Sequence, residues 1–219
     1  MTETEFEAAE KKRKLKKTLF ALAMGGVVGF LGAMAVMRVL ESERFASGGA
    51  SVEVASLVGM IYLVTGLFVG LGALVPNAGA KVLNVEDADE LREQRAMLLY
   101  SSIGMVVAAI ALIVVAHGGA AGAINPDVAL GVYIVTSIIA VAVSLKSRRH
   151  SDELMRAVST ETASMSFYLL ALIGGTWAVL AHLQYVTAPT PLDWLTMFWS
   201  LMLLAAFIVT AKRGMMAMR

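Results

Sequence analysis

The chain contains no cysteine and little charge. Among its 219 residues there is no Cys, and Asp, Glu, Lys and Arg together make up only 16%. The absence of cysteine excludes disulfide bonds, thiol catalysis and thiolate metal sites. The net charge of +1 gives the chain no polyelectrolyte character, so the sequence offers no basis for a nucleic-acid partner.

The few charged residues are distributed unevenly, and long stretches of the chain are almost entirely apolar. Hydrophobic residues make up 58% of the chain, more than the roughly 45–50% typical of soluble domains. The charged residues gather in short islands between these runs, a pattern typical of proteins that cross a membrane several times. The sequence therefore predicts an all-α integral membrane protein.

Six apolar runs are long enough to cross a hydrocarbon core of about 30 Å at about 1.5 Å per residue. The first follows a Lys/Arg cluster and is longer than the core of a signal peptide, which has about 7–15 residues, so we expect an uncleaved spanning helix. The six predicted transmembrane helices lie at 18–40, 53–75, 97–117, 128–146, 164–185 and 192–211.

The spacing of these runs predicts a single transmembrane domain over 1–219. It consists of three helical hairpins at about 1–80, 84–149 and 150–219, with a charged helical extension at 1–17. Apart from Arg38 and Arg44, every Lys and Arg falls at one side of this arrangement. The positive-inside rule therefore predicts that both termini are cytoplasmic, in the cytoplasmic (inner) membrane of a bacterium.

Helix start and stop signals surround the runs. Asn125-Pro126 and Pro189-Thr190-Pro191 predict the starts of the fourth and sixth helices, and Pro76 predicts the end of the second. Ser151 is the expected N-cap of the fifth helix.

Two charged stretches share the tripeptide Asp-Glu-Leu, at 89–91 and 152–154, and each leads directly into an apolar run. We expect them to extend the third and fifth helices into the cytoplasm, where they form a candidate contact surface. Its residues are Asp89, Glu90, Arg92, Asp152, Glu153 and Arg156.

The first two runs carry small residues at helical spacing, which allow helix backbones to approach closely. We interpret them as a packing face between the first two helices. A docking face for another protein and a glycine-lined solute path are the alternatives. The residues are Ala21, Gly25, Gly29, Ala33, Gly59, Gly66 and Gly70.

Ionisable residues lie near the outer ends of the predicted helices. They fit a solvated membrane boundary with helix caps, and the alternative is an outer ring that binds a metal or protons. These residues are Arg38, Glu53, His117, Asp127, His182 and Asp193. Because the middle of each run lacks a carboxylate or histidine, the sequence argues against proton-coupled transport.

One acid lies near the inner boundary: Glu161 is expected in the headgroup region, with pairing to Arg95 or Arg156 as the alternative. No Gly-x-Ser-x-Gly motif is present, and no histidine is expected beside a candidate nucleophile. We therefore expect no catalytic site, no cofactor and no metal.

Three functional hypotheses follow. The leading one is an accessory, scaffold or regulatory subunit that contacts the lipid bilayer and a partner membrane protein or a second copy of the chain. The alternative is a transporter or capture subunit for a small neutral or apolar solute, with a pocket near Trp177, Trp199 and His182. A third is an enzyme acting on lipids through His117 and His182.

Overall fold

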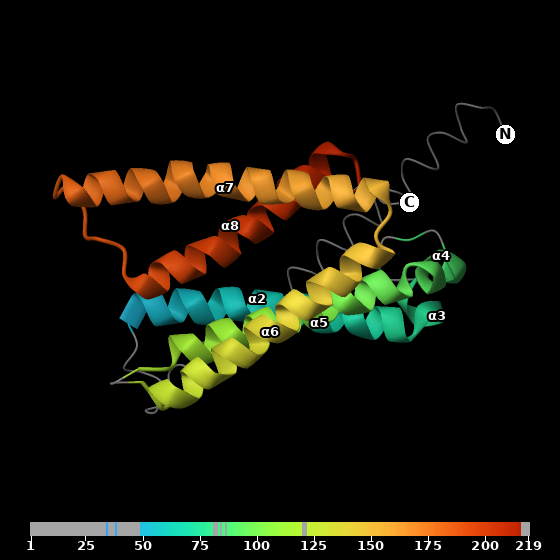
Figure 1. Cartoon of the computed structure of the whole chain (residues 1–219), viewed down its shortest axis with the longest axis horizontal. Helices are drawn as coiled ribbons and strands as arrows, with labels where there is room; N and C mark the ends of the chain where they lie inside the picture. The colour runs from blue at the N-terminus through green and yellow to red at the C-terminus, as the bar shows by residue number, and fades with distance from the viewer. Residues whose placement is uncertain are drawn as a thin grey trace.

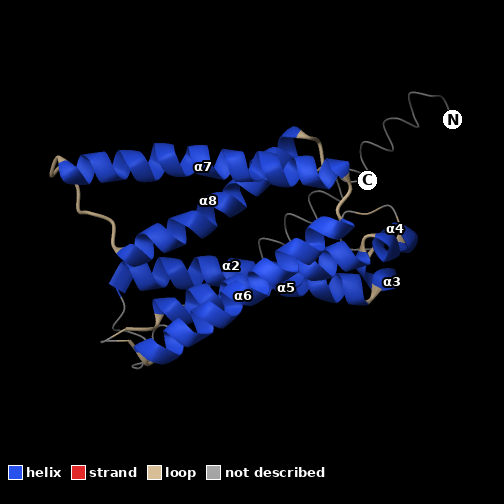
Figure 2. Ribbon diagram, viewed as in Figure 1, coloured by secondary structure: helices blue, strands red, loops and turns tan. Residues whose placement is uncertain are grey.

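The computed structural model describes residues 34, 38, 49–80, 83, 85, 87–119 and 122–215. These residues are almost entirely α-helical, and no strand occurs among them (Figure 2). The helices are α2 (Gly49–Leu74), α3 (Pro76–Gly79), α4 (Ala88–Glu93), α5 (Arg95–Ala116), α6 (Pro126–His150), α7 (Glu153–His182) and α8 (Pro191–Lys212).

Within the described residues, five helices are long and apolar enough to cross a membrane: α2, α5, α6, α7 and α8. They coincide with the second to sixth predicted runs. The first predicted helix, at 18–40, lies outside the described residues except for Met34 and Arg38, which are helical and exposed. The predicted extension at 1–17 also lies outside them.

The helices pack side by side around one central pair. α2 and α5 share the most extensive contact, α6 packs on α5, and α8 packs on α2 and touches α5. α7 packs on α8, which crosses it at an angle, and forms one edge of the molecule (Figure 1). The starts of α2, α6 and α8 lie at the same end as the last residues of α5 and α7, so successive long helices α5 to α8 alternate in direction (Figure 1).

Two helix starts agree with the sequence signals. The Asn125 side chain accepts a hydrogen bond from the Asp127 amide at 2.8 Å, and Pro126 begins α6. Thr190 and Asp193 form a reciprocal capping box around Pro191 at the start of α8. Each arrangement satisfies backbone amides that have no partner inside the helix.

The predicted N-cap of α7 is wrong by one residue. Asp152 takes this position, and its carboxylate accepts a hydrogen bond from the Met155 amide at 2.7 Å. The Ser151 hydroxyl instead donates to the Ser147 carbonyl at 2.9 Å and closes the end of α6. Because the loop between α6 and α7 is so short, the two neighbouring polar side chains serve different helices.

The two charged lead-in stretches also differ. α7 runs without a break from Glu153 into its apolar part. Before α5, by contrast, the chain bends at Gln94, which separates the short helix α4 from α5. The prediction of a continuous helical extension is therefore correct for the fifth predicted helix and wrong for the third.

The core lies where α2, α5 and α8 meet. It contains two clusters of buried residues, Ala55, Leu112 and Ala116 in one and Tyr62, Ala108 and Ala109 in the other. The partly buried Trp199 of α8 packs against both clusters.

Tyr62 of α2 contacts Trp199 of α8 through both its hydroxyl and its ring. Its hydroxyl donates a hydrogen bond to the Trp199 carbonyl at 2.8 Å. The two rings meet edge to face, with their centroids 5.7 Å apart, a geometry favoured for aromatic pairs. α8 therefore joins the central pair through both polar and apolar contacts.

Candidate functional site

The glycine face of α2 lies against α5. A Cβ atom added at Gly66 would lie 3.0 Å from the Cβ of Met105, and the Ser102 hydroxyl donates to the Gly66 carbonyl at 2.7 Å. Gly59 faces Ile113 and Gly70 faces Ser102 in the same way. The backbones approach this closely because these positions lack a side chain.

The sequence assigned this face to contact with the first predicted helix. For Gly59, Gly66 and Gly70 the structure corrects that assignment, since the atoms that face them belong to α5. The other members of the predicted face, Ala21, Gly25, Gly29 and Ala33, lie outside the described residues.

A second link between α2 and α5 lies at the predicted outer end. The Ser56 Oγ and the His117 Nε2 are 3.1 Å apart, and both side chains are buried. His117 is the first residue after α5. The expectation that no histidine lies beside a candidate nucleophile is therefore wrong. Sequence reasoning missed Ser56 because its partner is 61 residues away and only helix pairing brings the two together.

The surroundings of this pair favour a structural role. A serine nucleophile needs a substrate carbonyl within contact distance and donors for the resulting oxyanion. Ser56 is only 4% and His117 only 8% exposed, so the pair is enclosed between α2 and α5 and is suited to joining the two helices.

The other predicted outer residues, apart from Asp193, are exposed. They are Arg38, Glu53, Asp127 and His182. Within the part of the chain that the structure describes, no three His, Asp or Glu side chains lie close enough together to hold a metal ion.

Asp193 is the outer acid with the most partners. Its carboxylate accepts hydrogen bonds from the Thr190 amide at 2.7 Å and the Thr190 hydroxyl at 2.8 Å. The Ser51 hydroxyl also hydrogen-bonds to it, which links the start of α8 to the first turn of α2. These contacts identify Asp193 as a helix cap that also connects two helices.

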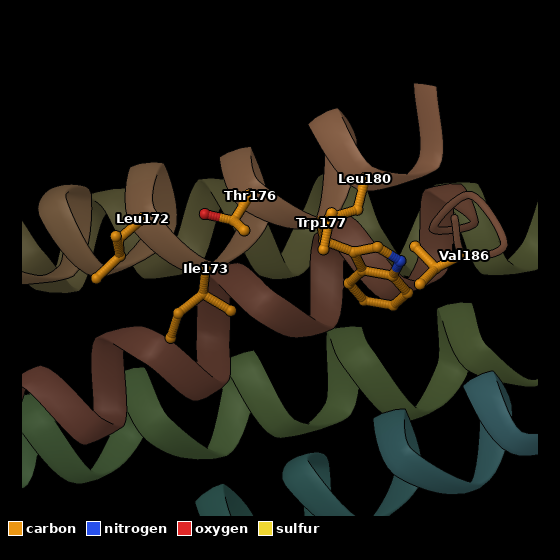
Figure 3. A pocket seen from close by; sticks show the side chains of 6 residues that line it. All are labelled: Leu172, Ile173, Thr176, Trp177, Leu180 and Val186. Atoms are coloured by element: carbon orange, nitrogen blue, oxygen red, sulfur yellow. The ribbon is translucent and has the colours of Figure 1, made fainter. Parts of the chain in front are cut away.

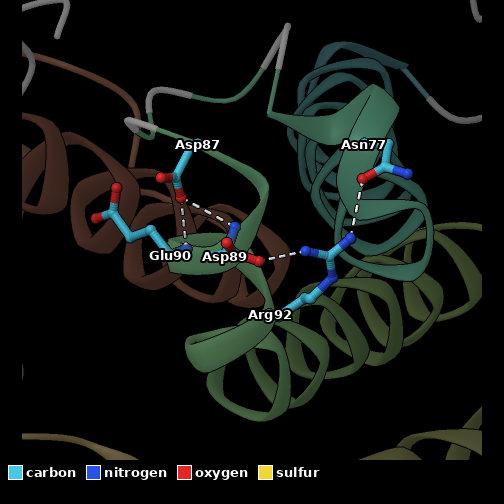
Figure 4. Close-up of polar contacts among 5 residues, drawn as sticks. All are labelled: Asn77, Asp87, Asp89, Glu90 and Arg92. Carbon is cyan, nitrogen blue, oxygen red and sulfur yellow. Dashed lines mark hydrogen bonds and ion pairs between the residues drawn. The ribbon is translucent and has the colours of Figure 1, made fainter.

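The first charged stretch forms a small hydrogen-bonded cluster at the opposite end. The Asp87 carboxylate caps α4 by accepting from the amides of Asp89 and Glu90, at 2.9 Å each (Figure 4). Arg92 pairs with Asp89 and donates to the Asn77 Oδ1 at 3.0 Å (Figure 4). Arg92 therefore links α4 to α3. Part of the candidate contact surface is thus already hydrogen-bonded to other residues of the same chain.

The second charged stretch is more open. Asp152 caps α7, and Glu153 is exposed. The Arg156 guanidinium donates to the Arg148 carbonyl at 3.3 Å, back across the turn between α6 and α7. Arg156 therefore lies beside the last residues of α6.

Glu161 pairs with neither of its two predicted partners. Its Oε2 lies 2.8 Å from the Nε of Arg213, the first residue after α8. The ion pair joins α7 to the end of α8, while Arg95 and Arg156 take no part in it. Because Arg213 follows Glu161 by 52 positions, the local sequence holds no signal for this contact.

A shallow apolar groove of about 430 Å³ runs along the C-terminal half of α7 (Figure 3). The Trp177 indole borders it and donates to the Thr187 carbonyl at 2.9 Å. The groove includes Trp177 as predicted, but Trp199 belongs to the core and His182 is not part of the lining. Its lining consists of Leu172, Ile173, Thr176, Trp177, Leu180 and Val186.

In comparisons with protein-family models, curated proteins and solved structures, the chain matches none of them.

Proposed function

We propose that this protein is a multi-pass membrane protein without catalytic activity that serves as an accessory, scaffold or regulatory subunit. In this proposal α7 is the helix that contacts the partner. The partner is another membrane protein or a second copy of the chain. Both termini are cytoplasmic, as the distribution of Lys and Arg predicts.

The observation that carries the proposal is the exposure of α7. α7 is the longest helix of the described chain. Only 6% of its most apolar 18-residue segment is buried, compared with 39% of the corresponding segment of α2. Phe167, Tyr168 and Leu172 are each at least 65% exposed, and the first two rings pack edge to face at 5.8 Å. Large exposed aromatic side chains are typical anchors of protein contacts.

The polar contacts support the same proposal. Hydrogen bonds between α2 and α5 involve the side chains of Ser56, His117 and Ser102. These bonds join α2 and α5 into a stable central pair. A packed central pair with α7 exposed beside it is suited to binding another membrane protein or a second copy of the chain through helix packing.

A photocrosslinking experiment in native membranes tests the proposal. A photoreactive phenylalanine analogue is placed at Phe167 or Tyr168, and the matched control position is Phe207, an exposed aromatic residue of α8. We expect a discrete protein adduct from α7 and none from Phe207. The adduct mass distinguishes a second copy from another protein.

The same preparation gives an independent readout. In mild detergent at native expression, we expect the protein to elute with a partner. A monomer without co-purifying protein, together with only lipid adducts from α7, would contradict the proposal.

A second candidate, a capture subunit for a small apolar solute, is favoured by the groove beside Trp177. Its apolar lining and single polar side chain, Thr176, suit a neutral ligand. The groove is open to the surroundings of the protein, which favours a ligand that arrives through the lipid phase. Quenching of tryptophan fluorescence by an apolar solute in the wild type, lost in Trp177→Leu, would favour this candidate over the first.

A further inference from the structure

The end of α6 combines cations with an apolar helix face. Lys146, Arg148 and Arg149 are all exposed, and none of the described carboxylates forms an ion pair with them. Arg156 adds a fourth cation, because its guanidinium donates to the Arg148 carbonyl. The nearby Asp152 carboxylate is engaged in capping α7.

The cations continue a row of exposed apolar side chains. Ile138, Val141 and Leu145 are 64%, 61% and 58% exposed, and they lie three and four residues apart. Arg148 and Arg149 follow Leu145 at the same spacing, so they lie on the same face of the helix. One face of α6 therefore changes from apolar to cationic within a single turn.

The end of α6 is held in place by its neighbours. The His150 Nδ1 lies 2.9 Å from the Lys146 carbonyl, and its ring lies on Tyr100 of α5 with the centroids 5.4 Å apart. These contacts fix the last turn of α6 against α5, and the flanking Lys146, Arg148 and Arg149 are exposed.

We propose that this face of α6 binds an anionic phospholipid. The phosphate group lies among Arg148, Arg149 and Arg156, and the acyl chains lie along Ile138, Val141 and Leu145. A lipid fits better than a free phosphate or a nucleic acid because only an amphiphile satisfies the cationic and the apolar halves of the face together. Cations next to a spanning helix favour anionic lipids by a factor of about five each.

Lipid binding to the purified full-length protein tests this proposal. Phosphatidylglycerol is titrated into the detergent-solubilised protein and bound lipid is counted by native mass spectrometry, with phosphatidylcholine as the reference lipid. We expect phosphatidylglycerol to bind more tightly, and Arg148→Gln/Arg149→Gln to weaken its binding about 25-fold, from about fivefold per cation.

Two variants serve as controls. Lys212→Gln removes one exposed cation from the end of α8 and is expected to change the affinity by less than about twofold. Arg148→Lys/Arg149→Lys keeps the charge and is expected to retain most of the binding. Should the double Gln variant aggregate, the single Gln variants, each expected to lose about fivefold, provide the same test.

Three outcomes would overturn the proposal. The first is equal binding of phosphatidylcholine, which would mean that charge plays no part. The second is an equal loss in Lys212→Gln, which would indicate a diffuse surface effect. The third is full competition by glycerol phosphate, which would show that the apolar face does not contribute.

Discussion

The pair α2 and α5 and the pair α7 and α8 are all apolar enough to cross a membrane, but the two pairs pack in different ways. Between α2 and α5, three glycines face the partner helix and two buried hydroxyls bond across the contact. Between α7 and α8, Gly174 meets the Trp194 ring, and the Arg213–Glu161 pair joins one end. Apolar composition alone does not produce close packing, because the most apolar 18-residue segment of α6 has a mean hydropathy of 2.4 and is 11% buried, whereas that of α2 has 2.2 and is 39% buried.

The difference has a simple physical cause. Lipid chains are as apolar as leucine side chains, so burying apolar surface against another helix gains little inside a bilayer. Close backbone approach and hydrogen bonds between helices supply the stability instead. α2 has both features toward α5, whereas most of the α7 surface has neither and stays exposed. The following substitutions test this comparison.

The largest effect is expected from Gly66→Leu. The added side chain would collide with Met105 and Ser102, and overpacking of this kind typically costs about 1–3 kcal/mol. Gly175→Leu on α7 is the matched control, because a Cβ there meets nothing within 4 Å. Unfolding in mixed micelles gives the free energy difference, and equal losses in the two variants would refute the comparison.

Ser56→Ala is expected to have the next largest effect. The change removes the hydroxyl bonded to His117, and a hydrogen bond of this kind contributes about 0.5–1.5 kcal/mol to stability. Ser166→Ala on α7, whose exposed hydroxyl donates to its own helix at the Ala163 carbonyl, should cost less than about 0.5 kcal/mol. Similar values from thermal unfolding of both variants would argue against a stabilising link at the outer end.

Glu161→Gln is expected to have the smallest effect. The pair with Arg213 is partly exposed, with side chains 44% and 34% accessible, and such pairs contribute about 0–1 kcal/mol. High salt should reduce the difference between wild type and variant further. A loss above 2 kcal/mol in the unfolding measurement would show that α7 depends on this contact far more than its exposure suggests.

Much of the described architecture could be predicted because its signals are local. Apolar runs give the positions of the spans, and Asn125-Pro126, Thr190-Pro191 and Pro76 mark helix boundaries through short-range hydrogen bonding and proline geometry. Where two local signals compete, as at Ser151 and Asp152, the sequence favours the wrong cap because both side chains are competent.

The site contacts could not be predicted because they depend on which helices are neighbours. Small residues at Gly59, Gly66 and Gly70 show that a helix packs closely, but they do not say against which partner. The Ser56–His117 and Glu161–Arg213 contacts join residues 61 and 52 positions apart. Apolar periodicity contains no information at that distance, since every face of these helices is similarly hydrophobic.

The position of α7 outside α8 has a consequence for synthesis. α5 is made after its packing partner α2, and α6 is made directly after α5, on which it packs. α7 is made before α8, the helix on which it packs. We therefore expect α7 to gain its contacts with the rest of the chain only after α8 has been made.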